Sequence, residues 1–461
     1  MNYYEVLIGD VQYHGKNALT YSHESDLTRG TIVRIALRSR SVLGVVANQV
    51  SKPSFTVKPI AAVAPSLPLP EQLFEMINWM YAYYPAPFGA IVRLFMPPTS
   101  AFSNNRAGSS LAPSKKPVGA PSVPPAPLTP EQASAVNTIT SSGYHLLHGI
   151  TGSGKTRVYL ELVQRTLEDN RSAIILTPEI GLTAQLTEPF EQQYPGKVLV
   201  LHSRLTVAQR RDLWYRIINA QSPVIVIGPR SALFAPVRHL GLIVIDESHD
   251  QAYKSETTPR YRAERVAGTL AQFHSASIVS GTATPNIEDY YVARAKNRPI
   301  ITLSRLAVSS GTNTRATIVD LRDKSNLSRS RILSTPLILA LQGALQQKEQ
   351  GLLFLNRRGT AGAVICSHCG WQSICDHCDL PLTYHGDSHQ LRCHVCGRTR
   401  PLPSSCPECQ KTDILLKTVG TKAVVDEVRR LFPEARIVRF DTDTERHEQL
   451  ETQHEALQSG A

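Results

Sequence analysis

A glycine-rich segment at residues 149–156 limits the fold of this chain more than any other feature of the sequence. The segment reads Gly-Ile-Thr-Gly-Ser-Gly-Lys-Thr and fits the pattern G-x-x-x-x-G-K-T in full. The apolar run Tyr144–Leu147 precedes it, and the helix-forming stretch Val158–Leu167 follows it. A loop of this kind between a strand and a helix lets backbone N–H groups surround phosphates. The segment therefore predicts a nucleotide-binding loop in an α/β domain.

The residues of this loop that we expect to bind a nucleotide offer backbone N–H groups, hydroxyl groups or a charge. Lys155 would reach the outer phosphates of ATP and take part in catalysis, and Thr156 would coordinate Mg²⁺. The predicted nucleotide-binding residues of the loop are Gly149, Thr151, Gly152, Ser153, Gly154, Lys155 and Thr156.

An acidic pair, Asp246-Glu247, comes directly after the apolar run Leu242–Ile245. An aspartate at the end of a strand can hold Mg²⁺, largely through water, and the adjacent glutamate can orient or deprotonate the attacking water. A solvated acidic turn is the alternative interpretation. Because the phosphate loop lies upstream, we predict that Asp246 and Glu247 act with Lys155 as the catalytic residues.

A third motif, Gly281-Thr-Ala-Thr-Pro285, follows the apolar run Ser277–Ser280. Small hydroxyl residues at the end of a strand can link a nucleotide site to a bound nucleic-acid strand. A phosphate loop, an acidic pair and a Ser/Thr motif in this order are typical of helicases. Gln132 lies upstream of the loop, where helicases often place a glutamine that reads adenine, although an ordinary surface residue is the alternative.

All eight cysteines fall between residues 366 and 409, in four Cys-x-x-Cys pairs. A disulfide framework would be spread through the fold, so this clustering indicates metal binding. Eight thiolates complete two tetrahedral Zn²⁺ sites and leave no ligand position open for water, which indicates a structural or a DNA- and partner-facing role rather than a catalytic one. A redox or iron–sulfur site is the alternative. The spacing leaves the pairing open between adjacent and nested arrangements. The predicted ligands are Cys366, Cys369, Cys375, Cys378, Cys393, Cys396, Cys406 and Cys409.

The remaining sequence divides into segments of distinct character. The apolar runs at 33–37 and 42–46 predict a β-hairpin, and the run Pro70–Tyr84 predicts a helix within a β-rich domain at 1–98. Residues 99–127 are rich in Pro, Ser and Ala and predict a linker. Apolar runs and helical stretches alternate over 128–310, which predicts a parallel α/β domain. Two further strands are expected at 351–356 and 436–440.

The formal net charge of +11 favours a polyanionic partner. No uncharged apolar stretch is long enough to span a membrane, and Met1–Glu5 lacks the pattern of a signal peptide. We therefore expect a cytoplasmic protein with no membrane partner.

Several segments of the sequence resemble those of the PriA family of replication-restart helicases, which belongs to superfamily 2. They are the cysteine spacing, Gly420-Thr421, and the segments 176–183, 201–203, 228–236 and 354–359. The resemblance implies an α/β protein with a P-loop, RecA-like helicase lobe and a parallel sheet. A small β-rich domain that binds a 3′ DNA end would precede this lobe. A partial second RecA-like lobe at 311–365 and 411–461 would follow, interrupted by a two-zinc module at 366–410.

The resemblance also implies how the chain works. It implies ATP-dependent 3′-to-5′ unwinding at stalled forks, with Mg²⁺ as cofactor and helicase reloading as the outcome. Partners would be forked and single-stranded DNA, primosome proteins and single-stranded-DNA-binding protein. The zinc pairing would be nested, with Cys366/Cys369/Cys406/Cys409 on one ion and Cys375/Cys378/Cys393/Cys396 on the other. The segment Asp250–Arg265 would sense single-stranded DNA, with Tyr253 and Tyr261 for stacking and Lys254, Arg260, Arg262 and Arg265 for phosphates. An ordinary basic loop is the alternative.

Three departures from the family pattern alter these expectations. The linker at 99–127 stands where the family has a winged-helix domain, and Ser248 stands where the family has a second glutamate. The chain ends at Ala461, before the later motifs of the second lobe, including the segment that supplies an arginine finger. Since such an arginine contributes about 10³–10⁵ in rate to related phosphoryl transfers, a non-hydrolysing fork-binding scaffold is the alternative to an ATP-hydrolysing enzyme.

Overall fold

We analysed a computed structural model of the chain, which forms two compact units, Met1–Gly311 and Thr312–Ala461. The structure describes residues 1–15, 18–98, 126–139, 142–178, 180–202, 205–307, 316–330, 332–355, 362–385, 390–393, 395–415 and 421–439. Most of the predicted linker at 99–127 and the end of the chain after residue 439 lie outside the described residues. Within them, no helix is long and apolar enough to span a membrane.

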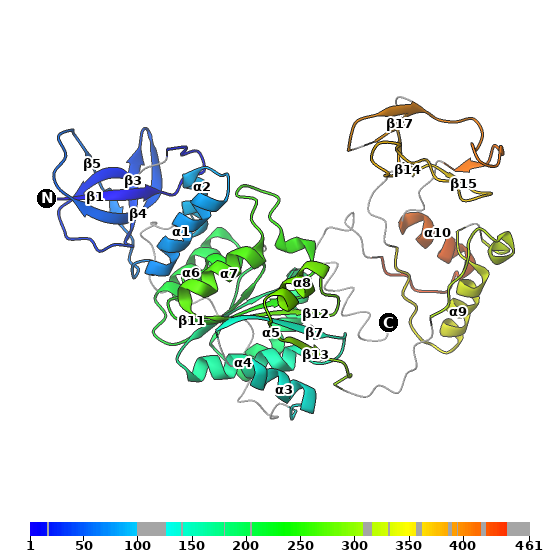
Figure 1. The fold of residues 1–461 in the computed structure, drawn as a ribbon, viewed down its shortest axis with the longest axis horizontal. Coiled ribbons are helices and arrows are strands. Elements are labelled where there is room, and N and C mark those ends of the chain that lie inside the picture. The colour runs from blue at the N-terminus through cyan, green and yellow to red at the C-terminus, as the bar shows by residue number, and fades with distance from the viewer. Residues whose placement is uncertain are drawn as a thin grey trace. The chain divides into compact units, whose positions relative to one another are not determined.

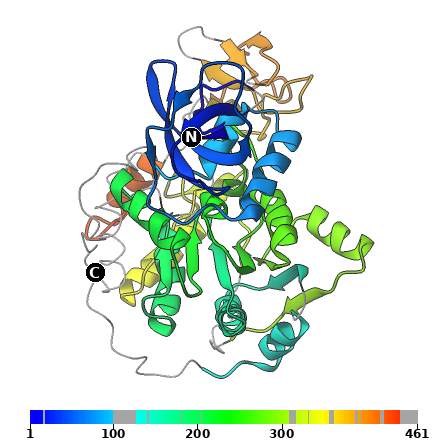
Figure 2. The ribbon, with the colours of Figure 1, turned by 90° about the vertical axis from the view of Figure 1, so that its left-hand side faces the viewer.

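The N-terminal part of the first unit is a six-stranded sheet with the order β5-β2-β1-β4-β3-β6. In Figure 2 these blue strands curl around one another. The predicted hairpin is confirmed, because β3 and β4 pair antiparallel with Ile32 opposite Val45. The strands are β1 (Asn2–Ile8), β2 (Leu19–His23), β3 (Ile32–Leu37), β4 (Arg40–Val50), β5 (Lys58–Pro59) and β6 (Ala62–Val63).

Two helices, α1 (Glu71–Tyr83) and α2 (Phe88–Leu94), follow this sheet and join it to the rest of the first unit. Figure 1 shows α1 between the blue sheet and the green helices of the α/β lobe. Buried side chains of α1 and α2 belong to the same apolar cluster as those of the lobe. At this junction the rings of Phe95 and Phe234 meet edge to face, with centroids 5.1 Å apart. The shared core makes one packed body of the sheet and the lobe.

The α/β lobe contains a seven-stranded parallel sheet with the order β13-β7-β12-β11-β8-β10-β9. Its central strands are buried on both faces, as parallel strands between two helical layers require. For example, Ile174 of β8 belongs to one apolar cluster and Ile175 to the other. The strands are β7 (Gly143–Gly149), β8 (Ser172–Leu176), β9 (Val198–Val200), β10 (Ile225–Gly228), β11 (Leu240–Asp246), β12 (Ser277–Thr282) and β13 (Ile300–Leu303).

Six α-helices of the lobe are described, and the buried residues of α3 to α7 divide between the two clusters. Helices α3 and α4 cover one face of the sheet, and α6 and α7 cover the other. The six are α3 (Pro130–Thr138), α4 (Lys155–Glu168), α5 (Ile180–Gln193), α6 (Val207–Ile218), α7 (Ala263–His274) and α8 (Ile287–Ala295). Because all the strands run the same way, the loops after β7, β11 and β12 meet at one edge of the sheet.

The second unit contains two α-helices and a cysteine-rich module in its described residues. Helices α9 (Thr335–Gln346) and α10 (Thr421–Leu431) share a small apolar cluster around Ile338 and Val428. The module has a four-stranded sheet, β14-β16-β17-β18, and a two-stranded sheet, β15-β19. Its strands are β14 (Gly362–Ala363), β15 (Ile365–Cys366), β16 (Thr383–His385), β17 (Gln390–Arg392), β18 (Thr399–Pro401) and β19 (Ile414–Leu415).

The strands expected at 351–356 and 436–440 are absent from the parts of those segments that the structure describes, 351–355 and 436–439. Leu353 and Ile437 lie against the apolar cluster of α9 and α10, whereas Leu352 and Phe354 are 89% and 82% exposed. An apolar run can bury a side chain against helices without a neighbouring strand, but a ladder of backbone hydrogen bonds needs that neighbour. The prediction of two strands was therefore wrong. The partial second RecA-like lobe stays a prediction.

Candidate nucleotide and metal sites

The predicted phosphate loop connects the end of β7 to the start of α4. Gly152 and Gly154 have φ angles of +81° and +79°, which favour glycine. At Gly149 a side chain would not fit, because a Cβ would lie 2.7 Å from Ser153 Oγ. The loop therefore turns tightly enough for the N-terminus of α4 to face a phosphate group. Thr151 is exposed and Thr156 is half-buried in the first turn of α4.

Lys155 lies between this loop and the acidic pair. Its Nζ donates to the backbone oxygen of Gly149 at 3.1 Å and lies 3.5 Å from Glu247 Oε1. The lysine side chain is 10% exposed, so solvent screens this ion pair only partly. The structure thus brings together two of the three residues that we predicted to be catalytic.

Asp246, the third of them, ends β11 and is held at two points by tyrosines. Tyr159 Oη donates to Asp246 Oδ1 at 3.0 Å, and Tyr253 Oη donates to the backbone oxygen of Asp246 at 2.5 Å. Burial raises the pKa of Asp246 from 3.8 to about 6, and the charge of Glu247 adds to this, while the Tyr159 hydrogen bond and Lys155 oppose it. The solvated turn of the alternative interpretation therefore does not describe Asp246, whereas Glu247 lies in a turn and its side chain is 33% exposed.

Hydrogen bonds connect the acidic pair to the Ser/Thr motif. His249 Nδ1 lies 3.5 Å from Glu247 Oε2 and 2.7 Å from the Oγ1 of the buried Thr282. The Ser248 N–H donates to the backbone oxygen of Gly281 at 3.1 Å. Glu247 itself has a φ of +45°, an uncommon angle for a residue with a side chain. Hydrogen bonds thus join the segment after β11, which carries the acidic pair, to the Ser/Thr motif at the end of β12.

Tyr159 and His249 are site residues that the sequence analysis missed. A signal existed for each. Tyr159 is the polar position in the mainly aliphatic buried face of α4, and His249 is the second residue after the acidic pair. Neither signal indicates a partner, because the partner comes from another strand. The serine in the unusual position, Ser248, is buried, and its hydroxyl has no hydrogen-bond partner among the described residues.

Gln132 is 2% exposed, so the alternative that it is a surface residue was wrong. Its Oε1 accepts from the Thr129 N–H at 3.0 Å as part of a capping box at the start of α3. Its Nε2 donates to the Ser153 backbone oxygen at 3.0 Å. The glutamine therefore fastens α3 to the phosphate loop and keeps one N–H and one oxygen lone pair for another partner.

The chain that leaves β13 also contacts the phosphate loop. The Glu131 carboxylate accepts from the Ser304 N–H and hydroxyl at 2.8 and 2.7 Å. Beyond it, the Ala307 N–H donates to the Gly152 backbone oxygen at 2.9 Å. These bonds seat the residues after β13 against the glycines of the loop.

The segment Asp250–Arg265 differs from its expected form. Tyr253 and Tyr261 are buried, and the ring of Tyr261 packs edge to face on Phe234 with centroids 5.1 Å apart. The expectation that their rings are available to stack on bases was wrong, because the apolar core of the lobe takes both rings. The cations of the segment, Lys254, Arg260, Arg262 and Arg265, are exposed as expected.

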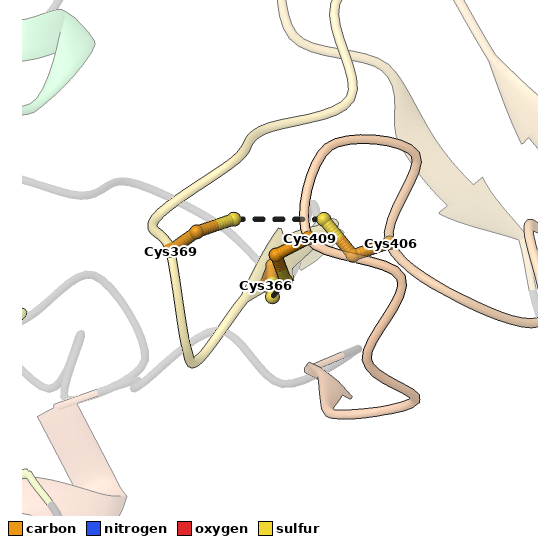
Figure 3. Close-up of side chains that lie close together, drawn as sticks. All are labelled: Cys366, Cys369, Cys406 and Cys409. Atoms are coloured by element: carbon orange, nitrogen blue, oxygen red, sulfur yellow. Dashed lines mark hydrogen bonds between the residues drawn. The ribbon is translucent and has the colours of Figure 1, made fainter.

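The cysteines form two groups of four. Within each group the sulfur atoms lie within 4.8 Å of one another. The members are Cys366, Cys369, Cys406 and Cys409 in one group, and Cys375, Cys378, Cys393 and Cys396 in the other. This is the nested arrangement that the family resemblance implies, and Figure 3 shows the first group converging from two loops.

The donor sets fit zinc. Four sulfur ligands at such separations match a closed tetrahedral site. The two groups therefore support zinc binding.

Three family models match parts of the chain. Residues 129–291 match the family model for DEAD/DEAH box helicases, residues 10–97 match the 3′DNA-binding domain, and residues 375–401 match the PriA DNA helicase Cys-rich region. A solved structure of RecG bound to a three-way DNA junction is similar over 40% of this chain and 25% of its own length, with 21% identity and a TM-score of 0.31.

Replication restart proteins named PriA are similar along much of the chain. The protein of Bacillus subtilis is 39% identical over 69% of this chain and 40% of its own length. The protein of Haemophilus influenzae is 39% identical over 72% of this chain and 46% of its own length. The chain therefore spans about half the length of these two relatives. The protein of Chlamydia pneumoniae is 32% identical over 96% of this chain and 70% of its own length. On this similarity and on its three matching domains, the chain belongs to the PriA family of replication restart proteins.

Proposed function

We propose that this chain binds ATP with Mg²⁺ and hydrolyses it to move 3′-to-5′ along DNA, as the helicase of replication restart. It would recognise stalled forks and initiate helicase reloading. One observation carries the proposal. The phosphate loop, the acidic pair and the Ser/Thr motif are joined by direct contacts, from Lys155 to Glu247 and from His249 to Thr282. Such contacts let a change at the phosphates reach the segment after β12.

In this proposal each site residue has a distinct role. Lys155 neutralises the outer phosphates, and Thr156 and Asp246 hold Mg²⁺. Glu247 orients the attacking water and accepts its proton. Backbone N–H groups around Gly149, Thr151, Gly152, Ser153 and Gly154 bind the remaining phosphate oxygens. Gln132 reads adenine with the N–H and the lone pair that its contacts leave over.

We also propose partners for the rest of the chain. The domain at 10–97 would capture the 3′ end of a nascent strand, and the exposed cations of Asp250–Arg265 would bind single-stranded DNA. Each cysteine group would hold one structural Zn²⁺. Primosome proteins and single-stranded-DNA-binding protein would assemble with the chain at forks in the cytoplasm.

ATP turnover of the purified chain, with and without forked DNA, tests the proposal. We expect turnover that DNA stimulates and that Lys155→Ala abolishes. Lys197→Ala is the matched control, because Lys197 is an exposed lysine of the same lobe. Turnover no higher than that of Lys155→Ala would overturn the helicase proposal for this chain and would favour the fork-binding scaffold.

Polarity needs a separate measurement. Partial duplexes with a single-stranded tail of either polarity should differ, because a 3′-to-5′ motor loads on a 3′ tail. Faster unwinding from a 5′ tail would contradict the proposed direction.

A further inference from the structure

The hydroxyl of Tyr159 lies where all three helicase motifs meet. Tyr159 stands on α4, one turn after Lys155, and its side chain is fully buried. Its Oη donates to Asp246 Oδ1 at 3.0 Å. On its other side is Gly281, where a Cβ would collide with this hydroxyl. One oxygen atom therefore contacts the acidic pair and the Ser/Thr motif from the helix that follows the phosphate loop.

A buried tyrosine can also be an ordinary core residue whose hydroxyl takes the nearest acceptor. Tyr194 provides that comparison, because its hydroxyl donates to the backbone oxygen of Leu160 on the same helix, also at 3.0 Å. The acceptor of Tyr159 is instead a half-buried carboxylate. A phenylalanine would fill the same space, so packing alone does not require the hydroxyl. Its donation to one carboxylate oxygen fixes how that carboxylate is turned.

The close approach of the Tyr159 ring and hydroxyl to Gly281 is a second observation about the placement of this hydroxyl. A Cβ there would lie 2.8 Å from Tyr159 Cζ as well as against the hydroxyl. The backbone oxygen of Gly281 also accepts from the Ser248 N–H at 3.1 Å, so the glycine lies beside both the tyrosine and the acidic segment. A glycine at the end of a buried strand is unfavourable unless something must approach closely. Here the tyrosine hydroxyl makes that approach.

We propose that Tyr159 is a positioning residue for Mg²⁺–nucleotide binding: its hydroxyl holds the Asp246 carboxylate in the orientation that the metal requires, and Gly281 provides the space. This inference rests on the proposed function, in which Asp246 helps to hold Mg²⁺. Tyr159 touches neither metal nor nucleotide in this scheme and acts through Asp246. Its loss should therefore weaken the metal-dependent part of nucleotide binding and leave the metal-independent part intact.

The test compares Tyr159→Phe with Tyr194→Phe in the full chain. Each variant loses one tyrosine hydroxyl that makes a hydrogen bond of 3.0 Å, from Tyr159 to Asp246 or from the half-buried Tyr194 to Leu160, and only the first variant changes the contacts of Asp246. Binding of a fluorescent ATP analogue is titrated at increasing Mg²⁺ and again in EDTA. A hydrogen bond to a charged group corresponds to about 10- to 100-fold in an equilibrium constant. We expect Tyr159→Phe to raise the half-saturating Mg²⁺ concentration by about tenfold or more, with unchanged binding in EDTA.

The controls separate this inference from a folding defect and from the proposed function. Tyr194→Phe should keep the wild-type Mg²⁺ requirement at a comparable unfolding temperature. A Tyr159→Phe variant whose Mg²⁺ requirement stays within twofold of wild type would overturn the inference alone. A wild-type chain that binds no nucleotide at any Mg²⁺ concentration would overturn the proposed function, and the inference with it.

A second variant tests the role of Gly281. Gly281→Ala should push the tyrosine hydroxyl away from Asp246 and reproduce the raised Mg²⁺ requirement. Since Phe at position 159 removes the closest clash, the double variant should unfold at a higher temperature than Gly281→Ala alone. A double variant that is no more stable than Gly281→Ala, with a wild-type Mg²⁺ requirement in Gly281→Ala, would contradict the proposal.

Discussion

Lys155 Nζ and Glu247 Oε1 lie 3.5 Å apart, so the residue expected to bind the outer phosphates is paired with the residue expected to activate water. Glu247 also approaches His249, at 3.5 Å through its other oxygen. A movement of Lys155 would therefore alter the contacts of Glu247 and, through His249, those of Thr282 in the Ser/Thr motif.

This pairing predicts different results for substitutions at its two ends. Glu247→Gln should keep ATP binding, because it removes a negative charge that competes with the phosphates for Lys155. It should lower turnover by about 10²–10⁴-fold, since the general base is lost. Lys155→Ala should lose binding as well. Nucleotide affinity and turnover are measured separately, with Glu256→Gln, an exposed glutamate of the same lobe, as the control. Turnover within threefold of wild type in Glu247→Gln would rule out its role as the base.

The burial of Asp246 predicts that its ionised carboxylate lowers the stability of the folded chain, although the proposed ATP turnover requires it. Burial is the main cause that raises its pKa from 3.8 to about 6. Between these values the folded chain binds more protons than the unfolded chain, so stability falls as the pH rises through this window and the loss is complete above pH 6. A shift of about two units corresponds to roughly 3 kcal/mol at most.

Asp246→Asn should therefore be more stable than wild type at pH 7.5 in the absence of Mg²⁺, while it abolishes ATP turnover. Its advantage should shrink as the pH falls from 6 and disappear near about pH 3, below the ordinary pKa of 3.8, where the aspartate is protonated in both the folded and the unfolded state. Urea unfolding across this pH range measures the difference. A difference between Asp246→Asn and wild type that is the same at pH 7.5 and at about pH 3 would show that ionising this carboxylate costs the folded chain no stability.

The nested zinc arrangement predicts how cysteine substitutions combine. Cys366 and Cys406 belong to one group, whereas Cys369 and Cys375 belong to different groups. Cys366→Ser/Cys406→Ser should lose one of two Zn²⁺ ions, and Cys369→Ser/Cys375→Ser should lose both. Metal content by mass spectrometry gives the count. If adjacent Cys-x-x-Cys pairs shared an ion instead, Cys366→Ser/Cys406→Ser would lose both ions and Cys369→Ser/Cys375→Ser would lose one. Full chelation should unfold the module, because each structural Zn²⁺ supplies on the order of 10 kcal/mol of apparent binding energy.

The segment Asp250–Arg265 predicts separate effects for its tyrosines and its arginines. Tyr261→Ala should lower the free energy of unfolding by about 3 kcal/mol or more, as expected for a large ring lost from a core. Tyr261→Phe, which keeps the ring, is its control. Arg260→Ala/Arg262→Ala should leave stability unchanged, weaken binding to single-stranded DNA and reduce the salt dependence by about 0.7 per phosphate contact. Unchanged DNA affinity in the arginine variant would remove this segment from the proposed DNA interface.

The sequence predicted the α/β lobe well, because its signals are local. The runs at β8, β10 and β11 are continuous and apolar, as strands covered on both faces must be. The same kind of run failed at 351–356. There Leu353 finds an apolar cluster, but the described residues offer its backbone no strand to pair with. An apolar run indicates that its side chains are buried, whereas a β-strand also needs a neighbouring strand for its backbone hydrogen bonds.

The two tyrosines of Asp250–Arg265 show the same limit at the level of function. Aromatic residues between cations suit either base stacking or a core, and only burial distinguishes the two. Tyr253 and Tyr261 both lie in the apolar core of the lobe. The ring of Tyr261 packs on Phe234, which follows β10 and itself packs on Phe95 directly after α2.

By itself, the sequence determined the chemistry of short segments in this protein. The glycines, lysine and threonine of the phosphate loop and the four Cys-x-x-Cys pairs act within a few residues, so their spacing is sufficient to identify them. Only the tertiary structure decided which segments meet. Tyr159 and Asp246 are 87 residues apart in the chain, and Cys366 and Cys409 are 43 apart. Contacts over such separations depend on how strands order themselves in a sheet and how loops pack, which a local pattern does not encode.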